Sequence, residues 1–547
     1  MTQTRFHACI LFIVCAVMFW WRLGHLGLID PDEPFYAQTT REMVEANDWI
    51  TPHIFGQPQF EKPIFFYWQS MTAQKIFGDT AFAARAPSAL LATGIVFLVW
   101  LFGRRMFSPL AGLLSAIVLA TGMEFVLMSR LMLTDICLAF FVTLSMFGLW
   151  MAVHDESRRN RWVFLQLLAS GFATLTKGPI GILFPALGGI AYLWFTRTRS
   201  PWRGRGLWLG LLAWTVIAVP WYVLMFLKFG WEYWDRFFVH ENWDRIITSE
   251  HDHSNHWWYY PMILFLGTLP WIPLLAASLL RSWKVARTDR RVLFLACWFL
   301  PSLMFLTIAQ SKLPSYIFFL FMPLALLMGP VLESWMQKGF RSTGERRLVC
   351  LSAIIQALGV LAAPFIRPEE AARYNWLAAI IAVPLVIAAA MLVRQQFKLA
   401  AASLGLTTAL VIGLALTKVS PDIEVVTSTR TIGQKIESLR RPGEPLVTAS
   451  FLTRAVNYFS GVRPAGEYSQ GPRAHYTPHP LPVIVRDKGL AKFAADYPSV
   501  LCVGQLRDLE DLTRPKSVLK DRCEKLLTIG DRVIFRIIPA DARPDAK

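Results

Sequence analysis

The feature that most constrains this chain is a series of apolar runs, most of them about 20 residues long, within its first 417 residues. A run of that length can cross the hydrocarbon core of a bilayer as a helix. Helices satisfy their own backbone groups, which the core of a bilayer requires. The sequence therefore predicts a polytopic α-helical membrane protein with about 13 transmembrane helices, centred near residues 16, 93, 117, 142, 169, 187, 216, 270, 300, 323, 357, 384 and 408.

Lysine and arginine are distributed unevenly between the short loops that separate these runs. One set of alternate loops holds 20 of them and the opposite set holds five, Arg130, Lys177, Lys312, Arg367 and Arg373. Cytoplasmic loops carry the basic excess, so the first set and the N-terminus are predicted to be cytoplasmic in a bacterial inner membrane. Residues 28–80, residues 229–258 and the C-terminal tail are then periplasmic. This topology and anionic membrane lipids account for the net charge of +17, and no nucleic-acid-binding motif is present.

The tail, residues 418–547, is less apolar and mixes two periodicities. Helix-like amphipathic stretches cover residues 429–441 and 452–459, and strand-like runs lie at 445–447, 482–485, 500–503 and 532–536. This mixture predicts a small periplasmic α/β domain after a transmembrane domain of residues 1–417. Cys502 and Cys523 are the only cysteines of the tail, and a disulfide and two free thiols are equal alternatives.

The long loop, residues 28–80, gathers charges and aromatic rings beside the first span. Asp32 and Glu33 follow that span, and Glu61 and Lys62 lie further along. Charged groups held near lipid are costly and usually functional. Helical patterns from Phe35 to Ala46 and from Pro63 to Phe77 predict two interfacial helices around these charges. We therefore predict the active site of an enzyme with a lipid-borne substrate, whereas helix capping is the alternative role for the two acids.

Other polar side chains stand at the predicted outward ends of spans. Lys62 is a compact point charge suited to a phosphate, with snorkelling to headgroups as its alternative. Asp135 lies in an apolar run five residues after Arg130, and a structural pair between them is one interpretation. Lys312 and Tyr316 are four residues apart and would share a helix face, unless Lys312 only sets topology.

The second outward loop, residues 229–258, contains His251, His253 and His256 close together. Their spacing matches no standard zinc site, so a solvated loop is an equal alternative. Glu61, His253 and His256 are the residues that we assign to a divalent metal, zinc or magnesium, if one is bound. For Glu61 the alternative is an ion pair with the neighbouring Lys62. No other cofactor is indicated.

Several short motifs follow one another through the membrane half of the chain. They are Asp32-Glu33-x-x-Tyr36-Ala37, Arg41-Glu42-Met43, Asp48-Trp49-Ile50, Phe60-Glu61-Lys62-Pro63, Thr176-Lys177-Gly178, Glu241 with Arg245, His253 before Trp258-Tyr259-Tyr260, and Lys312-Leu313-Pro314-x-Tyr316. Together they resemble the lipid A 4-amino-4-deoxy-L-arabinose (aminoarabinose) transferases. These are C-type (GT-C) glycosyltransferases related to the protein O-mannosyltransferases.

The resemblance implies a GT-C fold and a pentosyltransferase that inverts the configuration at the anomeric carbon of the sugar. Such an enzyme moves aminoarabinose from undecaprenyl phosphate to a lipid A phosphate in the outer leaflet, which gives resistance to polymyxin. Asp32, Glu33 and Asp135 are then the predicted catalytic residues, with Asp32 either a base or a stabiliser of positive charge on the sugar. The predicted ligands of the carrier phosphate and sugar are Lys62, Tyr36, Arg130, Arg245, Lys312 and Tyr316.

One position departs from the family pattern. The family usually has an arginine directly before the tyrosine of the first motif, where this chain has Phe35. That arginine would help to bind the carrier phosphate, so another cation, Arg130 or Arg245, is expected to substitute for it.

Two other functions stay open on the sequence alone. A related polyprenyl-phosphate-sugar transferase would act on protein hydroxyls or on another envelope glycan. A lipid or sugar flippase would share the spans and the basic loops, but transporters more typically show repeated halves with charges distributed through the spans. Here the ionisable groups gather at the predicted outward face, which favours an enzyme.

Overall fold

The computed structural model describes residues 3–247, 256–366, 374–470 and 481–538. The chain divides into two compact units: the helical unit, Met1–Leu23 with Ala86–Leu414, and the mixed unit, Gly24–Arg85 with Ala415–Lys547. The long loop therefore groups with the C-terminal tail. This differs from the sequence prediction, which assigned the loop to the transmembrane domain.

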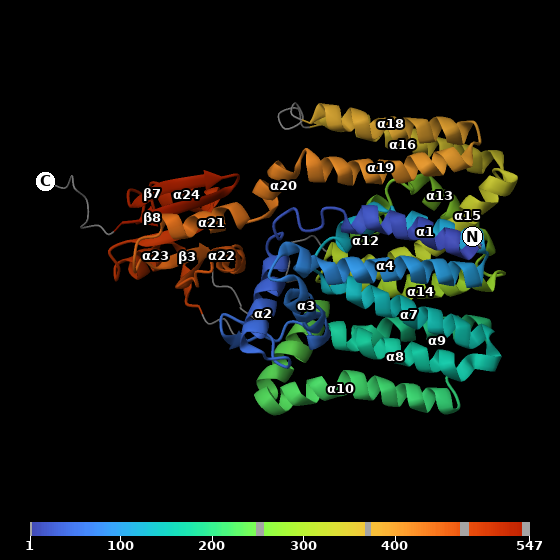
Figure 1. The fold of residues 1–547 in the computed structure, drawn as a ribbon, viewed down its shortest axis with the longest axis horizontal. Coiled ribbons are helices and arrows are strands. Elements are labelled where there is room, and N and C mark those ends of the chain that lie inside the picture. Colours follow the sequence, from blue (N-terminus) through green and yellow to red (C-terminus); the bar gives the residue numbers. More distant parts are fainter. Residues whose placement is uncertain (1–2, 248–255, 367–373, 471–480, 539–547) are drawn as a thin grey trace. The chain divides into compact units, whose positions relative to one another are not determined.

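The helical unit contains helices and connecting loops in the part of the chain that the structure describes. Neighbouring long helices such as α7, α8 and α10 pack side by side (Figure 1). In chain order the helices are α1 (Gln3–Cys15), η1 (Ala16–Trp20), α4 (Ala81–Met106), α5 (Pro109–Ala120), α6 (Met123–Ser129), α7 (Thr134–His154), η2 (Glu156–Arg158), α8 (Arg159–Lys177), α9 (Ile180–Thr196), α10 (Arg205–Trp234), η3 (Asp235–Asp244), α11 (Arg245–Ile247), α12 (Tyr259–Gly267), α13 (Ile272–Val285), α14 (Arg290–Ile308), η4 (Pro314–Leu320), α15 (Phe321–Lys338), α16 (Thr343–Ile366), α18 (Asn375–Val393) and α19 (Phe397–Thr417).

The predicted count of 13 membrane spans is not confirmed. Within the described ranges, eight helices are long and apolar enough to cross a membrane, or nine if α5 and α6, which meet at a 66° bend, form one span. Every predicted centre except the one near residue 270 falls in a helix; that one lies in the break between α12 and α13. Apolar runs thus located the helices. Among those outside the eight, α9 has only 17 residues and α8 carries three basic side chains.

The C-terminal part of the mixed unit is the predicted α/β domain. Its six-stranded sheet has the order β5-β4-β3-β6-β8-β7, with parallel pairing from β5 to β6 and antiparallel pairing of β8 with both β6 and β7. The elements are α20 (Ser420–Thr427), α21 (Arg430–Leu439), β3 (Leu446–Ala449), α22 (Thr453–Ser460), β4 (Gly466–Ser469), β5 (Val483–Val485), α23 (Arg486–Ala494), β6 (Val500–Gln505), α24 (Leu506–Thr513), β7 (Cys523–Ile529) and β8 (Arg532–Ile537).

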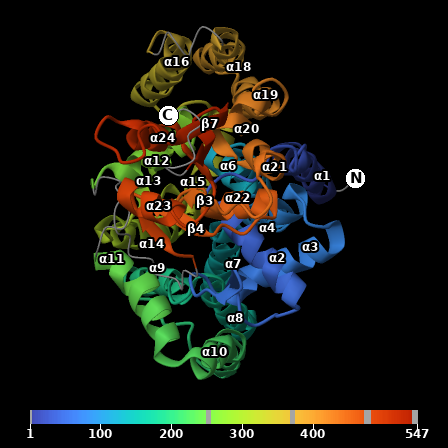
Figure 2. The ribbon, with the colours of Figure 1, turned by 90° about the vertical axis from the view of Figure 1, so that its left-hand side faces the viewer.

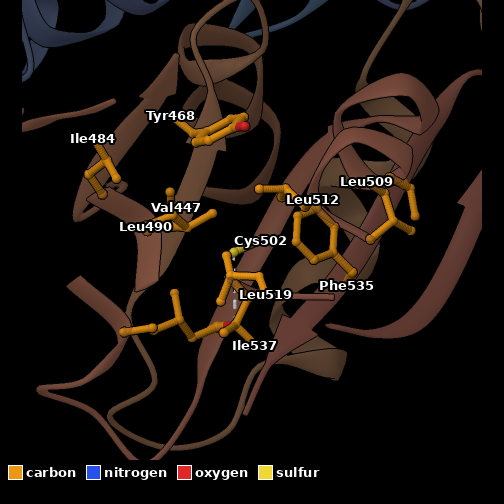
Figure 3. Close-up of a cluster of buried hydrophobic side chains, with 13 residues drawn as sticks. Val447, Tyr468, Ile484, Leu490, Cys502, Leu509, Leu512, Leu519, Phe535 and Ile537 are labelled. Carbon is orange, nitrogen blue, oxygen red and sulfur yellow. Dashed lines mark hydrogen bonds between the residues drawn. The ribbon is translucent and has the colours of Figure 1, made fainter. Parts of the chain in front are cut away.

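Alternation along the strands divides the side chains of this domain between two apolar cores. On one face, Cys502 of β6 and Phe535 of β8 pack with Leu490 of α23 and Leu509 of α24 (Figure 3). On the other face, residues of β6 and β8 pack against α21 and α22. Figure 2 shows these two helix pairs on opposite sides of β3 and β4. The sheet is therefore the middle layer of a three-layer sandwich.

The two cysteines of the tail are free in the structure. Cys502 faces Phe535 and Cys523 faces Ile537, so β8 lies between their strands. Two strand spacings separate the Cα atoms by about 10 Å, beyond the roughly 7 Å limit for a disulfide. Of the two alternatives, the structure selects free thiols.

A thiol count tests this arrangement. After denaturation, the full-length protein is expected to react with a maleimide at both Cys502 and Cys523. In the folded protein Cys502 is expected to stay unreactive, since burial raises the pKa of its thiol well above the ordinary value. Peptide mass spectrometry without reductant measures both states. A peptide that contains the two residues joined by a disulfide would contradict the fold.

The loop part of the mixed unit contains the two helices predicted from the sequence, α2 (Asp32–Ala46) and α3 (Ile64–Phe77). Between them β1 (His53–Ile54) and β2 (Gln57–Pro58) form a hairpin whose turn residues, Phe55 and Gly56, both have positive φ. Glu42 of α2 accepts hydrogen bonds from both turn amides at 2.8 Å. The hairpin is thus fixed to α2. The interfacial position of α2 and α3 stays a prediction.

Candidate active site

The first predicted catalytic residue, Asp32, is the first residue of α2, and its side chain is exposed. A carboxylate in the first turn stabilises a helix through its macrodipole. The helix ends at Asn47, which adopts the left-handed conformation that commonly terminates helices. Asp32 is therefore presented at a rigid helix terminus, where a negative charge is favourable and solvent can reach it.

Glu33, the next residue, has different surroundings. Its side chain is 2% exposed and forms a two-pronged ion pair with Arg85, which is 3% exposed, at 2.6 and 2.9 Å. Arg85 also donates to the carbonyl oxygens of Leu26 and Gly27, and the amide of Ile29 donates to Glu33. These contacts hold the entry of the loop onto α2. The geometry supports a structural role for Glu33 rather than the catalytic one that the sequence predicted.

Lys62 lies just before α3 and is 8% exposed. Its ammonium donates to the carbonyl oxygen of Glu61 at 3.0 Å. The Gln59 side chain accepts from the amide of Glu61 at 2.9 Å, and its other end donates to the hydroxyl of Tyr67 at 2.6 Å. The backbone that carries Lys62 is thus tied to α3.

Tyr36 and Phe35 are both buried inside the loop. The ring of Tyr36 packs edge-on against Phe66 of α3, with 5.1 Å between centroids. The guanidinium of Arg454, from α22 of the C-terminal domain, lies 4.3 Å from the centroid of the Phe35 ring. Tyr36 therefore joins α2 to α3, and the position without the expected arginine is covered by another arginine.

The C-terminal domain also holds Asp30, which lies two residues before Asp32. Arg532 of β8 pairs with Asp30 at 2.8 Å, and both side chains are almost fully buried. Thr429 donates a further hydrogen bond to the same carboxylate, and the amide of Asp30 donates to the carbonyl oxygen of Thr427. Burial raises the pKa of Asp30 above its ordinary value, although Thr429 and Arg532 oppose the shift. Asp30 thus anchors the loop to the domain.

In the helical unit, Asp135 pairs with Lys177 at 2.6 Å. Asp135 is in the first turn of α7 and Lys177 is the last residue of α8, so both helix macrodipoles favour the charges. The Lys177 ammonium also lies 4.8 Å from the centroid of the Tyr316 ring in η4. These three side chains form one polar cluster. The partner of Asp135 is therefore Lys177 and not Arg130, the pairing considered from the sequence.

Arg130 and Lys312 both contact backbone oxygens. Arg130, at the end of α6, donates to the carbonyls of Met18, Phe19 and Trp21, where the first helix ends and its carbonyls lack partners. Lys312 is buried and donates to the carbonyl oxygen of Ala309 at 2.6 Å. Burial lowers the pKa of Lys312 below its ordinary value.

The predicted metal ligands do not form a set in the part of the chain that the structure describes. Among the described residues, no group of three His, Cys, Asp or Glu side chains is placed to hold a metal ion. Glu61 pairs with Arg454, and His256 stacks on Trp258 with 5.0 Å between the rings. His253 lies outside the described residues, and Arg245 is described only as the first residue of α11.

Sequence reasoning did not single out three of the cations that organise these contacts, Arg85, Arg454 and Arg532, and it gave the fourth, Lys177, no partner. Arg85 had a usable signal, because a lone arginine at the start of an apolar helix requires a partner. Lys177 was part of a motif, but its pairing with Asp135 depends on how α7 and α8 pack. Arg454 and Arg532 had no local signal, since their partners are hundreds of residues away.

Known proteins resemble this chain in sequence and in fold. The family model for dolichyl-phosphate-mannose-protein mannosyltransferase matches residues 7–231. An undecaprenyl phosphate-alpha-4-amino-4-deoxy-L-arabinose arabinosyl transferase of Pseudomonas aeruginosa (strain LESB58) is 34% identical over 369 residues, which make up 66% of this chain and 66% of that protein. The chain thus aligns with just under two thirds of that relative. A transferase of the same description from Pseudomonas fluorescens (strain Pf0-1) is 33% identical over 384 residues, 68% of this chain and 67% of that protein.

The crystal structure of ArnT from Cupriavidus metallidurans, bound to undecaprenyl phosphate, matches with a TM-score of 0.78 at 24% identity. The match covers 98% of this chain and 99% of that chain, so the fold is shared over nearly the whole length. The predicted class, a polytopic helical membrane protein with a C-terminal α/β domain, is confirmed. With relatives above 30% identity over two thirds of its length, the chain belongs to the family of undecaprenyl phosphate-alpha-4-amino-4-deoxy-L-arabinose arabinosyl transferases.

Proposed function

We propose that this protein transfers 4-amino-4-deoxy-L-arabinose from undecaprenyl phosphate to a phosphate group of lipid A. The observation that carries the proposal is the loop itself, which presents an exposed carboxylate, Asp32, and a fixed lysine, Lys62, in one compact unit. The relatives that carry the arabinosyl transferase description support the choice of sugar and carrier. The reaction takes place at the periplasmic face of the bacterial inner membrane.

The chemistry is a single inverting displacement at the anomeric carbon. An oxygen of the lipid A phosphate forms a bond to that carbon while the bond to the carrier phosphate breaks, and undecaprenyl phosphate leaves with the electron pair. Lys62 stabilises the charge that develops on the leaving phosphate. The acceptor phosphate is already largely anionic at neutral pH, so it needs little help from a base. Asp32 therefore acts by stabilising positive charge on the sugar.

Lipid A mass spectrometry in a strain that lacks its own aminoarabinose transferase tests the proposal. The wild-type chain is expected to add the mass of one aminoarabinose to lipid A and to raise polymyxin resistance. Asp32→Ala, expressed to the same level in the membrane, is expected to leave lipid A unmodified. An expressed wild-type protein that modifies no lipid A would contradict the proposal.

A second candidate follows from the match of residues 7–231 to the protein mannosyltransferase model. An enzyme of that type would transfer a polyprenyl-phosphate-linked sugar to protein hydroxyls or to another envelope glycan. Glycan analysis of envelope proteins from the same strains separates this outcome from lipid A modification. A flippase would form no covalent product in either analysis.

A further inference from the structure

Arg454 connects the C-terminal domain with the segment that carries Lys62. Its guanidinium lies 3.5 Å from the carboxylate of Glu61, the residue directly before Lys62, and covers the ring of Phe35 at 4.3 Å. Both partners of the ion pair are partly shielded from solvent, with 30% and 18% of their side chains exposed. One arginine thus contacts both α2 and the segment before α3.

The pairing of Arg454 with Glu61 affects Lys62, because Glu61 is the neighbouring residue. Its carboxylate is one residue from the Lys62 ammonium, which already donates to the Glu61 carbonyl oxygen. If Arg454 were absent, the charge of the Glu61 carboxylate would act more strongly on the neighbouring Lys62 ammonium, since opposite charges interact strongly where they are partly desolvated. That attraction would compete with any phosphate for Lys62.

We propose that Arg454 is a positioning residue for binding of the carrier phosphate. By pairing with Glu61, it keeps that carboxylate from competing with the phosphate for Lys62. The C-terminal domain thereby contributes to binding of the donor. It does so indirectly, because Arg454 acts on Lys62 through Glu61 and does not itself contact the reacting atoms. The inference rests on the proposed function in one respect, the contact between Lys62 and the carrier phosphate.

Other contacts besides those of Arg454 join α22 to the loop, so the fold is expected to survive the loss of its side chain. Tyr458, one turn further along α22, donates to Asp79 at 2.9 Å, and its ring lies 4.0 Å beneath the guanidinium of Arg41. Arg41 also donates to the carbonyl oxygen of Tyr458 at 2.9 Å. Arg454→Ala is therefore expected to fold with α22 still attached to α2.

The test uses purified full-length protein in detergent micelles. It measures the Kd for undecaprenyl phosphate together with kcat and KM for undecaprenyl-phosphate-linked aminoarabinose. Arg454→Ala is expected to raise Kd and KM about fivefold, ~1 kcal/mol, with kcat within about twofold of wild type. Arg454→Lys is expected to recover part of the loss. The double variant Arg454→Ala/Glu61→Gln is expected to return Kd to near the wild-type value, because the competing carboxylate is gone.

The matched control is Arg463→Ala, which removes the same charge from an exposed position of the same domain and is expected to change nothing. The inference is overturned if Arg454→Ala binds the carrier as well as wild type, or if adding Glu61→Gln fails to improve binding. If wild type binds undecaprenyl phosphate but transfers no aminoarabinose, the proposed function fails while the Kd series still decides the role of Arg454. If wild type does not bind the carrier, both fail.

Discussion

Arg85→Met is expected to lower the free energy of opening of α2 by about 3–5 kcal/mol, because it leaves Glu33 buried without its cation. The Leu26 and Gly27 carbonyl oxygens lose their donors in the same variant, which adds to the loss. Hydrogen exchange with mass spectrometry on the full-length protein measures the effect, since it reports the opening of individual helices. Faster exchange is expected across residues 32–46.

Two further variants make this expectation specific. Arg514→Met removes an arginine of the same unit that pairs with Asp511 but is 70% exposed, and exposed pairs of this kind contribute at most about 1 kcal/mol. Glu33→Leu combined with Arg85→Met is expected to recover part of the loss, since neither charge is then buried alone. If Arg85→Met costs no more than Arg514→Met, the buried pair is not what holds the entry of α2.

The elements that could be predicted from the sequence are those with a local signal. The helices α2 and α3 of the loop, the helices α21 and α22, and strands β3, β5, β6 and β8 all follow from periodicity and flanking residues. Strands β4 and β7 were missed because β4 has no apolar run and β7 carries two charged side chains. The count of 13 spans is not confirmed, because hydropathy locates an apolar helix without showing whether that helix crosses the membrane.

The sequence indicated which residues belong to the candidate site more readily than it indicated what each side chain does there. Asp32 and Glu33 are neighbours with the same chemistry, yet one is exposed and the other is buried against Arg85. Adjacent helix positions point about 100° apart, so the fold and not the motif decides which acid meets solvent. The pairs Asp30–Arg532 and Glu61–Arg454 join segments about 400 residues or more apart, and no local pattern encodes them.

Asp32→Asn is expected to lower kcat by about 10²–10⁴ while leaving the fold unchanged. The substitution keeps the shape of an exposed side chain and removes only its charge. The substitution also removes the favourable interaction of the charge with the α2 macrodipole, which is worth about 0.3–1 kcal/mol. Glu45→Gln is the matched control, because it removes one carboxylate charge from an exposed position of the same helix. Glu45→Gln is expected to retain wild-type turnover.

The pH dependence of this defect separates the two roles that the sequence left open for Asp32. A group that stabilises positive charge on the sugar is needed at every pH at which it is ionised, so the ratio of wild-type to Asp32→Asn kcat should stay constant from about pH 6.5 to 8.5. A base becomes less necessary as the acceptor loses its own proton, so for a base the ratio would fall as pH rises. Because a phosphate acceptor is already largely anionic across this range, we expect the constant ratio. Wild-type turnover by folded Asp32→Asn would remove Asp32 from the mechanism altogether.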